Sequence, residues 1–323
     1  MRKPKILVVG SCCTDFTFAG KIIPTEGSTV LGESFSTAPG GKGANQAYQA
    51  ARLGADVTFV GKFGRDSFGE NLNKVLQDVG IDTSRMLYSD TAPTASACIM
   101  LELTEAGAKN RIMVVPGSQM TFTAEDVAFL KDEIRNYDML ILQLEINMEI
   151  NELVAAYAYE AGVPVMLNCA PSAPLSEEFL SHITYLSPNE HEARDLTGIA
   201  IHSLDDAKAA AQNLLDRNVG NVLITMGSEG AVFADREHFL HRSCVPTTAV
   251  DPTAAGDSFI GAFCTAIGTG MPAGDAMIFA NHTASITVSR KGAMPSLPKL
   301  EEVLALMEKT GAAVDISPLS CLK

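Results

Sequence analysis

Residues Lys5-Ile-Leu-Val-Val-Gly10 form a short, continuously apolar run that ends in glycine. Such a run is typical of a strand that is buried on both faces, as in the parallel sheets of α/β proteins. The next segment with helical spacing begins only at Gly43, where alanines and a leucine recur at helical intervals up to Leu53. The sequence therefore predicts a buried first strand, a long connection and then a first helix.

The same alternation of strands and helices continues along most of the chain. We expect further strands near 57–61, 139–142, 164–167 and 221–225, and helices near 68–79, 124–135, 147–161 and 205–217. Strands separated by helices of this length need right-handed crossover connections and pair mostly in parallel. We therefore predict an α/β domain over residues 1–310, followed by a weakly structured tail at 311–323.

Two segments, 15–39 and 94–115, depart from this alternation. Both are rich in Thr, Val, Phe and Ile, are interrupted by Gly and Pro, and lack helical spacing. We expect them to form extra strands outside the main sheet. These strands would either form a lid over a ligand crevice at the carboxyl ends of the main strands, or be hairpins that decorate an edge.

Composition and charge restrict the classes of function. The 323 residues are 46% hydrophobic and 19% charged, which indicates an ordinary folded protein. The formal charge of −14 repels polyanions, so we expect neither nucleic acid nor an anionic membrane as a partner. An anionic nucleotide would have to be held locally by backbone amides, a few cations and a metal ion.

The cysteines predict the compartment. All seven are scattered and form no C-x-x-C pair, a pattern that suits a reducing environment. No apolar stretch is long enough to cross a bilayer, and the N-terminal apolar run is too short for a signal peptide. We therefore expect a cytoplasmic protein.

The segment Val250–Phe263, VDPTAAGDSFIGAF, carries the strongest chemical signal. Ala254, Ala255 and Gly256 lead directly into a helical pattern, so consecutive amides can converge on one anion where the helix dipole also favours negative charge. Asp257 then lies in the first turn, where it can take a proton from an attacking hydroxyl. A simple helix cap is the alternative, but it does not account for the small residues before the acid.

A second cluster, PGGKGANQ at 39–46, leads into the first long helix. Its glycines allow close approach of a ligand, and Lys42 and Asn45 are donors suited to sugar hydroxyls, although a plain glycine-rich turn remains possible. The spacing is not that of a P-loop.

Asp15 and Glu145 each follow an apolar run, at the edge where open parallel sheets bind ligands. Singly, each acid can be a helix cap or a surface charge; together we interpret them as acceptors for sugar hydroxyls.

A third motif, SPNEHE at 187–192, offers Asn189 and Glu192 as oxygen ligands to magnesium, through water. The same spacing after a proline is also a capping box that needs no metal, so both interpretations stay open. The motif does not continue as H-E-x-x-H, because Asp195 stands where the second histidine would be. A zinc protease is therefore excluded.

A weaker signal is LITMGSEG at 223–230, a buried strand that ends in a glycine turn. Thr225 and Gly227 could contact a nucleotide there, or form only a strand and a turn. The turn after the first strand, VGSCCT at 9–14, lacks the G-x-G-x-x-G pattern. A nicotinamide-dependent dehydrogenase is therefore disfavoured.

Two of these segments together resemble the signatures of the ribokinase-like carbohydrate kinases. GGKGANQ at 40–46 is similar to the first signature and DPTAAGDSF at 251–259 to the second, and the resemblance extends from about Ile6 to Leu300. The pair at this separation is far more specific than either glycine run alone. The resemblance implies a doubly wound α/β kinase domain with a small β-sheet lid that often forms a homodimer contact. It also implies the use of ATP, Mg²⁺ and a monovalent cation, K⁺.

The resemblance further implies a role for each candidate residue. The catalytic group comprises Asp257 as base, with Ala254, Ala255 and Gly256 as the anion hole. The sugar would be held by Asp15, Gly41, Lys42, Asn45, Glu145 and Asp257. The nucleotide side comprises Asn189, Thr225, Gly227, Gly256 and Asn281, and Glu192 with Asn189 organises magnesium and phosphate. The potassium loops, which bind mainly through backbone oxygens, comprise Asp251, Thr253, Arg290, Gly292 and Ser296.

The implied reaction is in-line transfer of the γ-phosphoryl group of ATP to a primary hydroxyl of a small sugar, with O5 of ribose as the first expectation. Members of the family commonly have asparagine where this chain has Cys13, and the loss of an amide changes which sugar hydroxyl is satisfied. Pro252 and Ala254 replace a commoner threonine and glycine without removing a charged group.

Other acceptors therefore stay open, namely 2-deoxyribose, fructose and a nucleoside. The absence of Trp and an aromatic content of 6% favour a small sugar over a nucleoside. From a different class, a sugar-binding regulator without turnover is disfavoured by the intact Asp257 and anion-hole segment.

Overall fold

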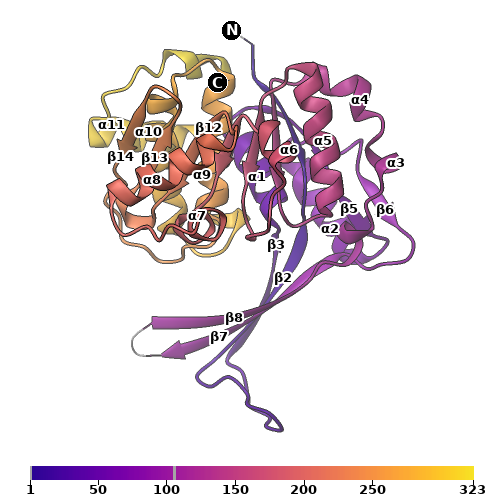
Figure 1. Cartoon of the computed structure of the whole chain (residues 1–323). Helices are drawn as coiled ribbons and strands as arrows, with labels where there is room; N and C mark the ends of the chain where they lie inside the picture. Colours follow the sequence, from indigo (N-terminus) through magenta and orange to yellow (C-terminus); the bar gives the residue numbers. More distant parts are fainter. Residues whose placement is uncertain (1, 105–106) are drawn as a thin grey trace.

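A central sheet runs through the molecule, and a smaller sheet extends from it as an arm (Figure 1). The computed structural model describes residues 2–104 and 107–323. Within these residues the central sheet has eight strands, in the order β14-β13-β12-β11-β10-β9-β1-β4, and the arm has four, in the order β3-β2-β7-β8. Among the helices described, none has the length and apolar character that a membrane crossing needs.

Most of the central strands run parallel, as predicted. The parallel strands are β1 (Lys5–Val9), β4 (Asp56–Val60), β9 (Met139–Gln143), β10 (Val165–Asn168), β11 (Tyr185–Ser187) and β12 (Asn221–Thr225). At the β12 edge the sheet continues with two antiparallel strands, β13 (Ala231–Ala234) and β14 (Phe239–Arg242). The sequence prediction did not include β11, β13 or β14.

Helices cover both faces of this sheet, so the doubly wound α/β prediction is confirmed (Figure 1). One layer contains α1 (Lys42–Arg52), α2 (Ser67–Asp78), α9 (Ala255–Gly268), α10 (Ala273–Val288) and α11 (Leu300–Thr310). The other contains α3 (Ala124–Val127), α4 (Leu130–Glu133), α5 (Met148–Ala161), α6 (Glu177–Ser181), α7 (Glu190–Thr197) and α8 (Leu204–Asp216). Along β1, Ile6 and Val8 enter the first core, whereas Leu7 and Val9 enter the second.

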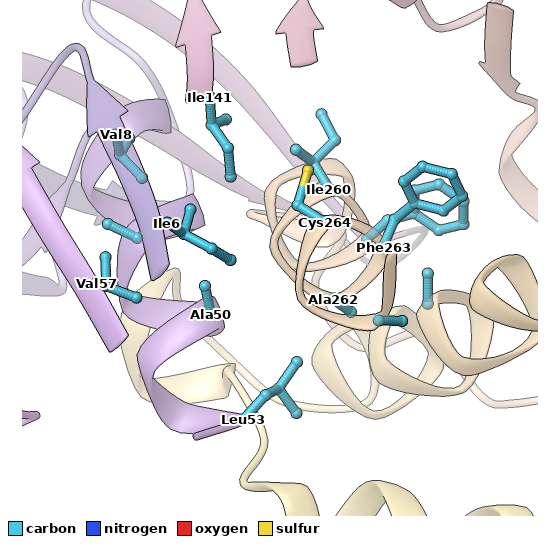
Figure 2. Close-up of a cluster of buried hydrophobic side chains, with 14 of the residues drawn as sticks. Ile6, Val8, Ala50, Leu53, Val57, Ile141, Ile260, Ala262, Phe263 and Cys264 are labelled. Carbon is cyan, nitrogen blue, oxygen red and sulfur yellow. The ribbon is translucent and has the colours of Figure 1, made fainter. Parts of the chain in front are cut away.

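Figure 2 shows the first core, where side chains of β1, β4 and β9 face helices α1 and α9. Ile6 and Ile141 lie opposite Ala50 of α1 and Ile260 of α9, and all four side chains are buried. Burial of one such aliphatic side chain contributes roughly 1.5–3 kcal/mol. This packing fixes both helices against the sheet, so that their N-termini meet at its carboxyl edge.

The arm consists of β2 (Cys13–Gly20), β3 (Ser34–Gly40), β7 (Ala95–Thr104) and β8 (Gly107–Val115). The predicted strands outside the main sheet are thus confirmed. Strand β2 begins shortly after β1 ends, and β3 leads through Gly41 directly into α1. The base of the arm is therefore attached to the carboxyl edge of the central sheet. A third, two-stranded sheet pairs β5 (Lys62–Gly64) with β6 (Leu87–Ser89).

The helix predicted at 124–135 is interrupted. It is divided into α3, α4 and a short 3₁₀ turn at Ile134–Asn136. Shorter-range hydrogen bonds, from Lys131 to Ala128 and from Asp132 to Phe129, replace part of the α-helical pattern there.

The prediction of a weakly structured tail is wrong for Ser317–Leu322, which form a 3₁₀ helix. Leu319 and Leu322 are three positions apart, lie on the same side of this helix and are buried in the first core. The carbonyl oxygen of Leu322 approaches Gly54 so closely that a Cβ there would lie 2.4 Å away. The tail therefore covers the core near the end of α1.

Candidate active site

Helix α9 begins with a tight turn of small residues. Ala254 has a left-handed backbone (φ 60°), which costs roughly 1–2 kcal/mol for a residue other than glycine. The amide of Ala255 donates to the Pro252 carbonyl at 3.2 Å. In the described part of the chain, no oxygen accepts the amide protons of Gly256 or Asp257, and no side chain caps the helix. These two amides can therefore bind an anion, whereas the amide of Ala255, also predicted for the anion hole, donates to Pro252 in this structure.

Asp257 is buried and is held by helix α1. Its Oδ2 accepts a hydrogen bond from Asn45 Nδ2 at 2.9 Å, and its Oδ1 accepts one from Gln46 Nε2 at 3.0 Å. The two helices approach closely because Gly261 has no side chain; a Cβ there would lie 2.8 Å from the Gln46 carbonyl oxygen. Each carboxylate oxygen keeps a lone pair for a further donor. Asn45 Oδ1 is buried without a partner among the described residues.

A cavity of about 210 Å³ opens beside Asp257. Predicted residues in its wall are Lys42, Asn189, Glu192, Thr225, Ala254, Ala255, Gly256 and Asp257. Residues in its wall that were not predicted as site residues are Asn168, Ala170, Ser187, Pro252 and Ile260. These residues lie at the carboxyl ends of β10, β11 and β12 and at the N-termini of α1, α7 and α9. The cavity is thus at the edge where open parallel sheets bind their ligands.

The predicted sugar-binding residues surround the start of α1. Glu145, which follows β9, accepts hydrogen bonds from the Lys42 amide at 3.1 Å and from the Ser11 hydroxyl. Gly41 has φ 94°, and a Cβ there would lie 2.6 Å from Cys12 Cα. Only glycine therefore lets the turn after β1 contact the beginning of α1.

Asp15, in strand β2 of the arm, lies near the acids of the central domain. Burial raises the pKa of Asp15, and the negative charges of Glu145 and Asp257 act in the same direction. The Cys13 thiol donates to Asp15 Oδ1 at 3.3 Å and opposes the shift. Asp15 is therefore not a helix cap but a partly desolvated acid at the root of the arm.

Lys42 supplies positive charge to the same region. Burial lowers the pKa of its ammonium group, but Asp257, Glu145 and Glu192 outweigh burial and raise it above its ordinary value. The side chain therefore stays charged beside the cavity, where it can attract an anionic ligand.

Asn189 and Glu192 form a capping box at the start of α7. Asn189 Oδ1 accepts from the Glu192 amide at 2.9 Å, and Glu192 Oε2 accepts from the Asn189 amide at 2.8 Å. Burial raises the pKa of Glu192, against the opposing effects of the Asn189 amide and Lys42. Both residues also line the cavity, so the cap fixes a carboxylate at the cavity wall.

The residues predicted for the nucleotide do not all meet in the cavity. Thr225 lines the cavity, and its backbone forms an isolated parallel β-bridge with Asn189. Gly227 begins the 3₁₀ turn that follows β12. Asn281 of α10 is not in the wall, because its Nδ2 donates to the carbonyls of Arg242 and Ser243 at 3.0 and 3.1 Å. In this structure Asn281 holds the chain that follows β14.

The two predicted potassium loops are joined by Asp251. Its carboxylate accepts from the Thr253 amide and hydroxyl at 3.0 and 2.6 Å and from the Gly292 amide at 2.9 Å. Burial acts to raise the pKa of Asp251, but these hydrogen bonds lower it overall. The side chains of Arg290 and Ser296 are engaged elsewhere, with a glutamate of α11 and a carbonyl in their own turn.

Comparison with known proteins decides the family. A family model described as "pfkB family carbohydrate kinase" matches residues 3–300. The chain belongs to this family. It is 41% identical to a ribokinase of Schizosaccharomyces pombe, over 92% of this chain and 96% of the relative. It is 31% identical to a deoxyribokinase of Salmonella typhi, over 92% and 96% respectively.

A solved structure supports the same relationship. The structure of Arabidopsis thaliana ribokinase complexed with ribose and ATP superposes with a TM-score of 0.87. The two sequences are 34% identical, over 95% of this chain and 99% of the other. This chain is accordingly an ATP-dependent carbohydrate kinase.

Besides Ser187 of the cavity wall, three polar residues of the site were not singled out from the sequence. Ser11 donates to Glu145, Gln46 donates to Asp257, and Asn168 lines the cavity. The available signals were the position of Gln46 inside the first glycine motif and that of Asn168 at the end of an apolar strand.

Two glycines with similar backbones test the contact between the β1 turn and α1. Gly41 and Gly80 have φ of 94° and 90°, so alanine strains both backbones alike, by roughly 1–2 kcal/mol. Only at Gly41 would the new methyl group also meet backbone atoms. We expect Gly41→Ala to lose more unfolding free energy than Gly80→Ala in urea denaturation, and to lose sugar affinity in calorimetry. Equal losses in the two variants would contradict this account.

The raised pKa of Asp15 predicts a pH dependence of stability. The folded state binds the Asp15 proton more tightly than the unfolded chain does. The free energy of unfolding therefore decreases as the pH rises from 3.8, the ordinary pKa of the acid, through its raised pKa in the folded state. We expect Asp15→Asn to be more stable than the parent at pH 7 and to lose this advantage below pH 3.8. Urea denaturation at a series of pH values measures the difference.

The control is Asp66, which caps α2. Burial acts to raise the pKa of Asp66, but hydrogen bonds from Thr94 and Gly69 lower it overall. Asp66→Asn should therefore lose stability at pH 7, the opposite sign to Asp15→Asn. Stabilities that change in the same direction would show that the cost of burying the Asp15 charge among other acids is absent.

Proposed function

We propose that this kinase transfers the γ-phosphoryl group of ATP to the primary hydroxyl of ribose, forming ribose 5-phosphate. The observation that carries the proposal is the start of α9, where the buried Asp257 carboxylate lies beside the free amides of Gly256 and Asp257 in one cavity wall. A base and an anion-binding turn in contact are the two groups that this reaction needs.

In the proposed mechanism Asp257 accepts the proton of the sugar hydroxyl as that oxygen attacks the γ-phosphorus, while the bond from the γ-phosphorus to the β–γ bridging oxygen breaks and ADP leaves. The amides of Gly256 and Asp257 and the ammonium group of Lys42 stabilise the charge that develops on the transferred group. Because Asp257 is buried and already fixed by two amide donors, little reorganisation accompanies the proton transfer.

The sugar would lie between the arm and the central domain. Asp15 and Glu145 provide acceptors for its hydroxyls, and Asn45, whose Nδ2 donates to Asp257, lies at the same edge of the sheet. Gly41 lets the turn after β1 contact the start of α1, which brings Glu145 against the Lys42 amide. This arrangement supports a small polyol with several hydroxyl groups as the acceptor.

Magnesium and potassium are part of the proposal, and the residues present fit both ions. A kinase magnesium ion is commonly bound by one or two carboxylates together with substrate phosphates, and the Glu192 carboxylate is held at the cavity wall. The loops around Asp251 and Gly292 are tied together beside α9, which suits a potassium ion bound by backbone oxygens. Bound Mg²⁺ would neutralise phosphate charge.

2-Deoxyribose is a second candidate acceptor. The similarity to a Salmonella typhi deoxyribokinase favours it, as does Cys13, whose thiol hydrogen-bonds to Asp15 at the sugar side of the site. A thiol is a weaker hydrogen-bonding group than an amide, so it holds a further sugar hydroxyl less well.

The decisive variant is Asp257→Asn, which keeps the shape of the side chain and removes the base. We expect a loss of about 10²–10⁴-fold in kcat with an unchanged fold, since general-base catalysis contributes that much. A coupled ATP-consumption assay against ribose, 2-deoxyribose, fructose and adenosine, with and without potassium, measures it. Turnover close to that of the parent would remove Asp257 from the mechanism, and a parent inactive on every sugar would remove the proposed function.

We also propose that the arm acts as a lid over the sugar and joins two copies of the chain. Large apolar side chains are exposed on it, namely Phe18, Phe35, Ile112, Met113, Val114 and Val115. Phe18 and Phe35 are cross-strand neighbours with ring centroids 4.9 Å apart. A concentration of exposed apolar groups on a small sheet indicates an interface.

The cysteines are all unpaired, which supports a cytoplasmic location.

If the arm joins two copies of the chain, a charge introduced on its apolar surface should separate them. Phe35 is 57% exposed, so Phe35→Asp should leave the fold intact and convert dimers to monomers in sedimentation velocity. The matched control is Tyr159→Asp, because Tyr159 is 60% exposed but lies on α5 of the central domain. If Phe35→Asp sediments like the parent, or if Tyr159→Asp dissociates equally, the arm is not the interface.

A further inference from the structure

A chain of buried side-chain amides lies behind Asp257. We propose that Gln46 and Gln143 are positioning residues that orient the Asp257 carboxylate for proton transfer, an inference that rests on the proposed function. Gln46 Nε2 donates to Asp257 Oδ1 at 3.0 Å, and Gln143 Nε2 donates to Gln46 Oε1 at 2.8 Å. Both glutamines are completely buried, and neither lines the cavity. They therefore act on the reaction only through Asp257.

The direction of the hydrogen bonds fixes the orientation of each group. An ionised carboxylate only accepts, so Gln46 must present its NH₂ group to Asp257 and its oxygen to Gln143. The second proton of Gln46 Nε2 points to Asn168 Oδ1 at 3.4 Å, and Asn168 Nδ2 donates to the Ser187 carbonyl at 3.2 Å. A rotation of the Gln46 amide would place an oxygen against the carboxylate. Three elements, α1, β9 and β10, thus hold the acid in α9.

The space around Gln143 shows that this glutamine is built into the fold. A Cβ on Gly10 would lie 1.8 Å from Gln143 Oε1, and one on Gly43 would lie 2.7 Å from it. The glycine at the end of β1 and the glycine in the first turn of α1 therefore both make room for the same amide. These two positions belong to the segments from which the fold and the sugar site were predicted.

Packing alone does not account for a glutamine at this position. The preceding residues of β9, Met139–Leu142, are all apolar and buried. Gln143 Oε1 is buried without a partner among the described residues, which costs roughly 1–3 kcal/mol. An apolar side chain would avoid that cost. The amide instead supplies the one property that an apolar residue lacks, a proton directed at Gln46.

The test compares two buried glutamines of the same helix. In Gln46→Met the carboxylate loses a charge-assisted hydrogen bond, so we expect kcat to fall about 10–100-fold while the KM values for sugar and ATP change little. The acidic limb of the pH–kcat profile should move to higher pH, because the lost hydrogen bond favours the charged form of the acid. A role in packing alone would not move this limb.

The matched control is Gln49→Met. Gln49 is also fully buried on α1, but its Nε2 donates to the Pro298 carbonyl at 3.0 Å and does not contact Asp257. This variant should lose thermal stability and keep the kcat and pH profile of the parent. A Gln46→Met variant that matches Gln49→Met in both kcat and pH profile would overturn the inference.

A second variant covers the case in which Gln46→Met does not fold. Gln143→Met leaves both amide donors on Asp257 and removes only the support of Gln46, so we expect a smaller fall in kcat in the same direction. A parental kcat and pH profile in this variant would also overturn the inference. Failure of this inference differs from failure of the proposed function. If only the inference fails, the parent still phosphorylates sugar and Asp257→Asn does not.

Discussion

The contact between the first turns of α1 and α9 is the constraint on which the site depends. Asp257 is buried, and a buried carboxylate is tolerated only where donors satisfy it. Those donors are Asn45 and Gln46 on the facing helix, and they reach the acid only because Gly261 lets the helices approach. The apolar core between the sheet and these helices fixes their positions, so packing and catalytic geometry are one requirement (Figure 2).

The charge distribution of the site opposes the stability of the free protein. Asp15 and Glu192 have raised pKa values, each mainly because of burial, and Asp257 contributes repulsion to both. Lys42 lies beside Glu192 and Asp257, and the charges of these two acids and of Glu145 raise the pKa of its ammonium group. In a chain with a formal charge of −14, a local ammonium group and free helix amides are what allow an anionic phosphate to bind. In the proposed reaction, hydroxyl donors and cations would offset the cost of burying these acids.

Local patterns predicted the features that are local. Apolar runs identified strands such as β1 and β9, and the glycine motifs identified the starts of α1 and α9, since each signal spans a few neighbouring residues. Strands β11, β13 and β14 were missed because three or four residues show no usable period. The hydrogen bond from Gln46 to Asp257 joins residues 211 positions apart, and no spacing rule contains it. The same reason explains why the anchoring of Asn281 to the chain after β14 could not be predicted.

In the proposed function, the attachment of the arm would couple sugar binding to closure of a lid. Asp15 belongs to β2 and pairs with Ala38 of β3, so it is part of the arm, whereas Glu145 and Asp257 belong to the central domain (Figure 1). The carboxylates on the two sides repel each other, which in the proposed function would favour an open arm. A sugar whose hydroxyls donate to both sides would reverse that preference, because hydrogen bonds would replace repulsion. In the proposed function, closure of the arm and recognition of the sugar are therefore the same event, controlled by one acid at the root of the arm.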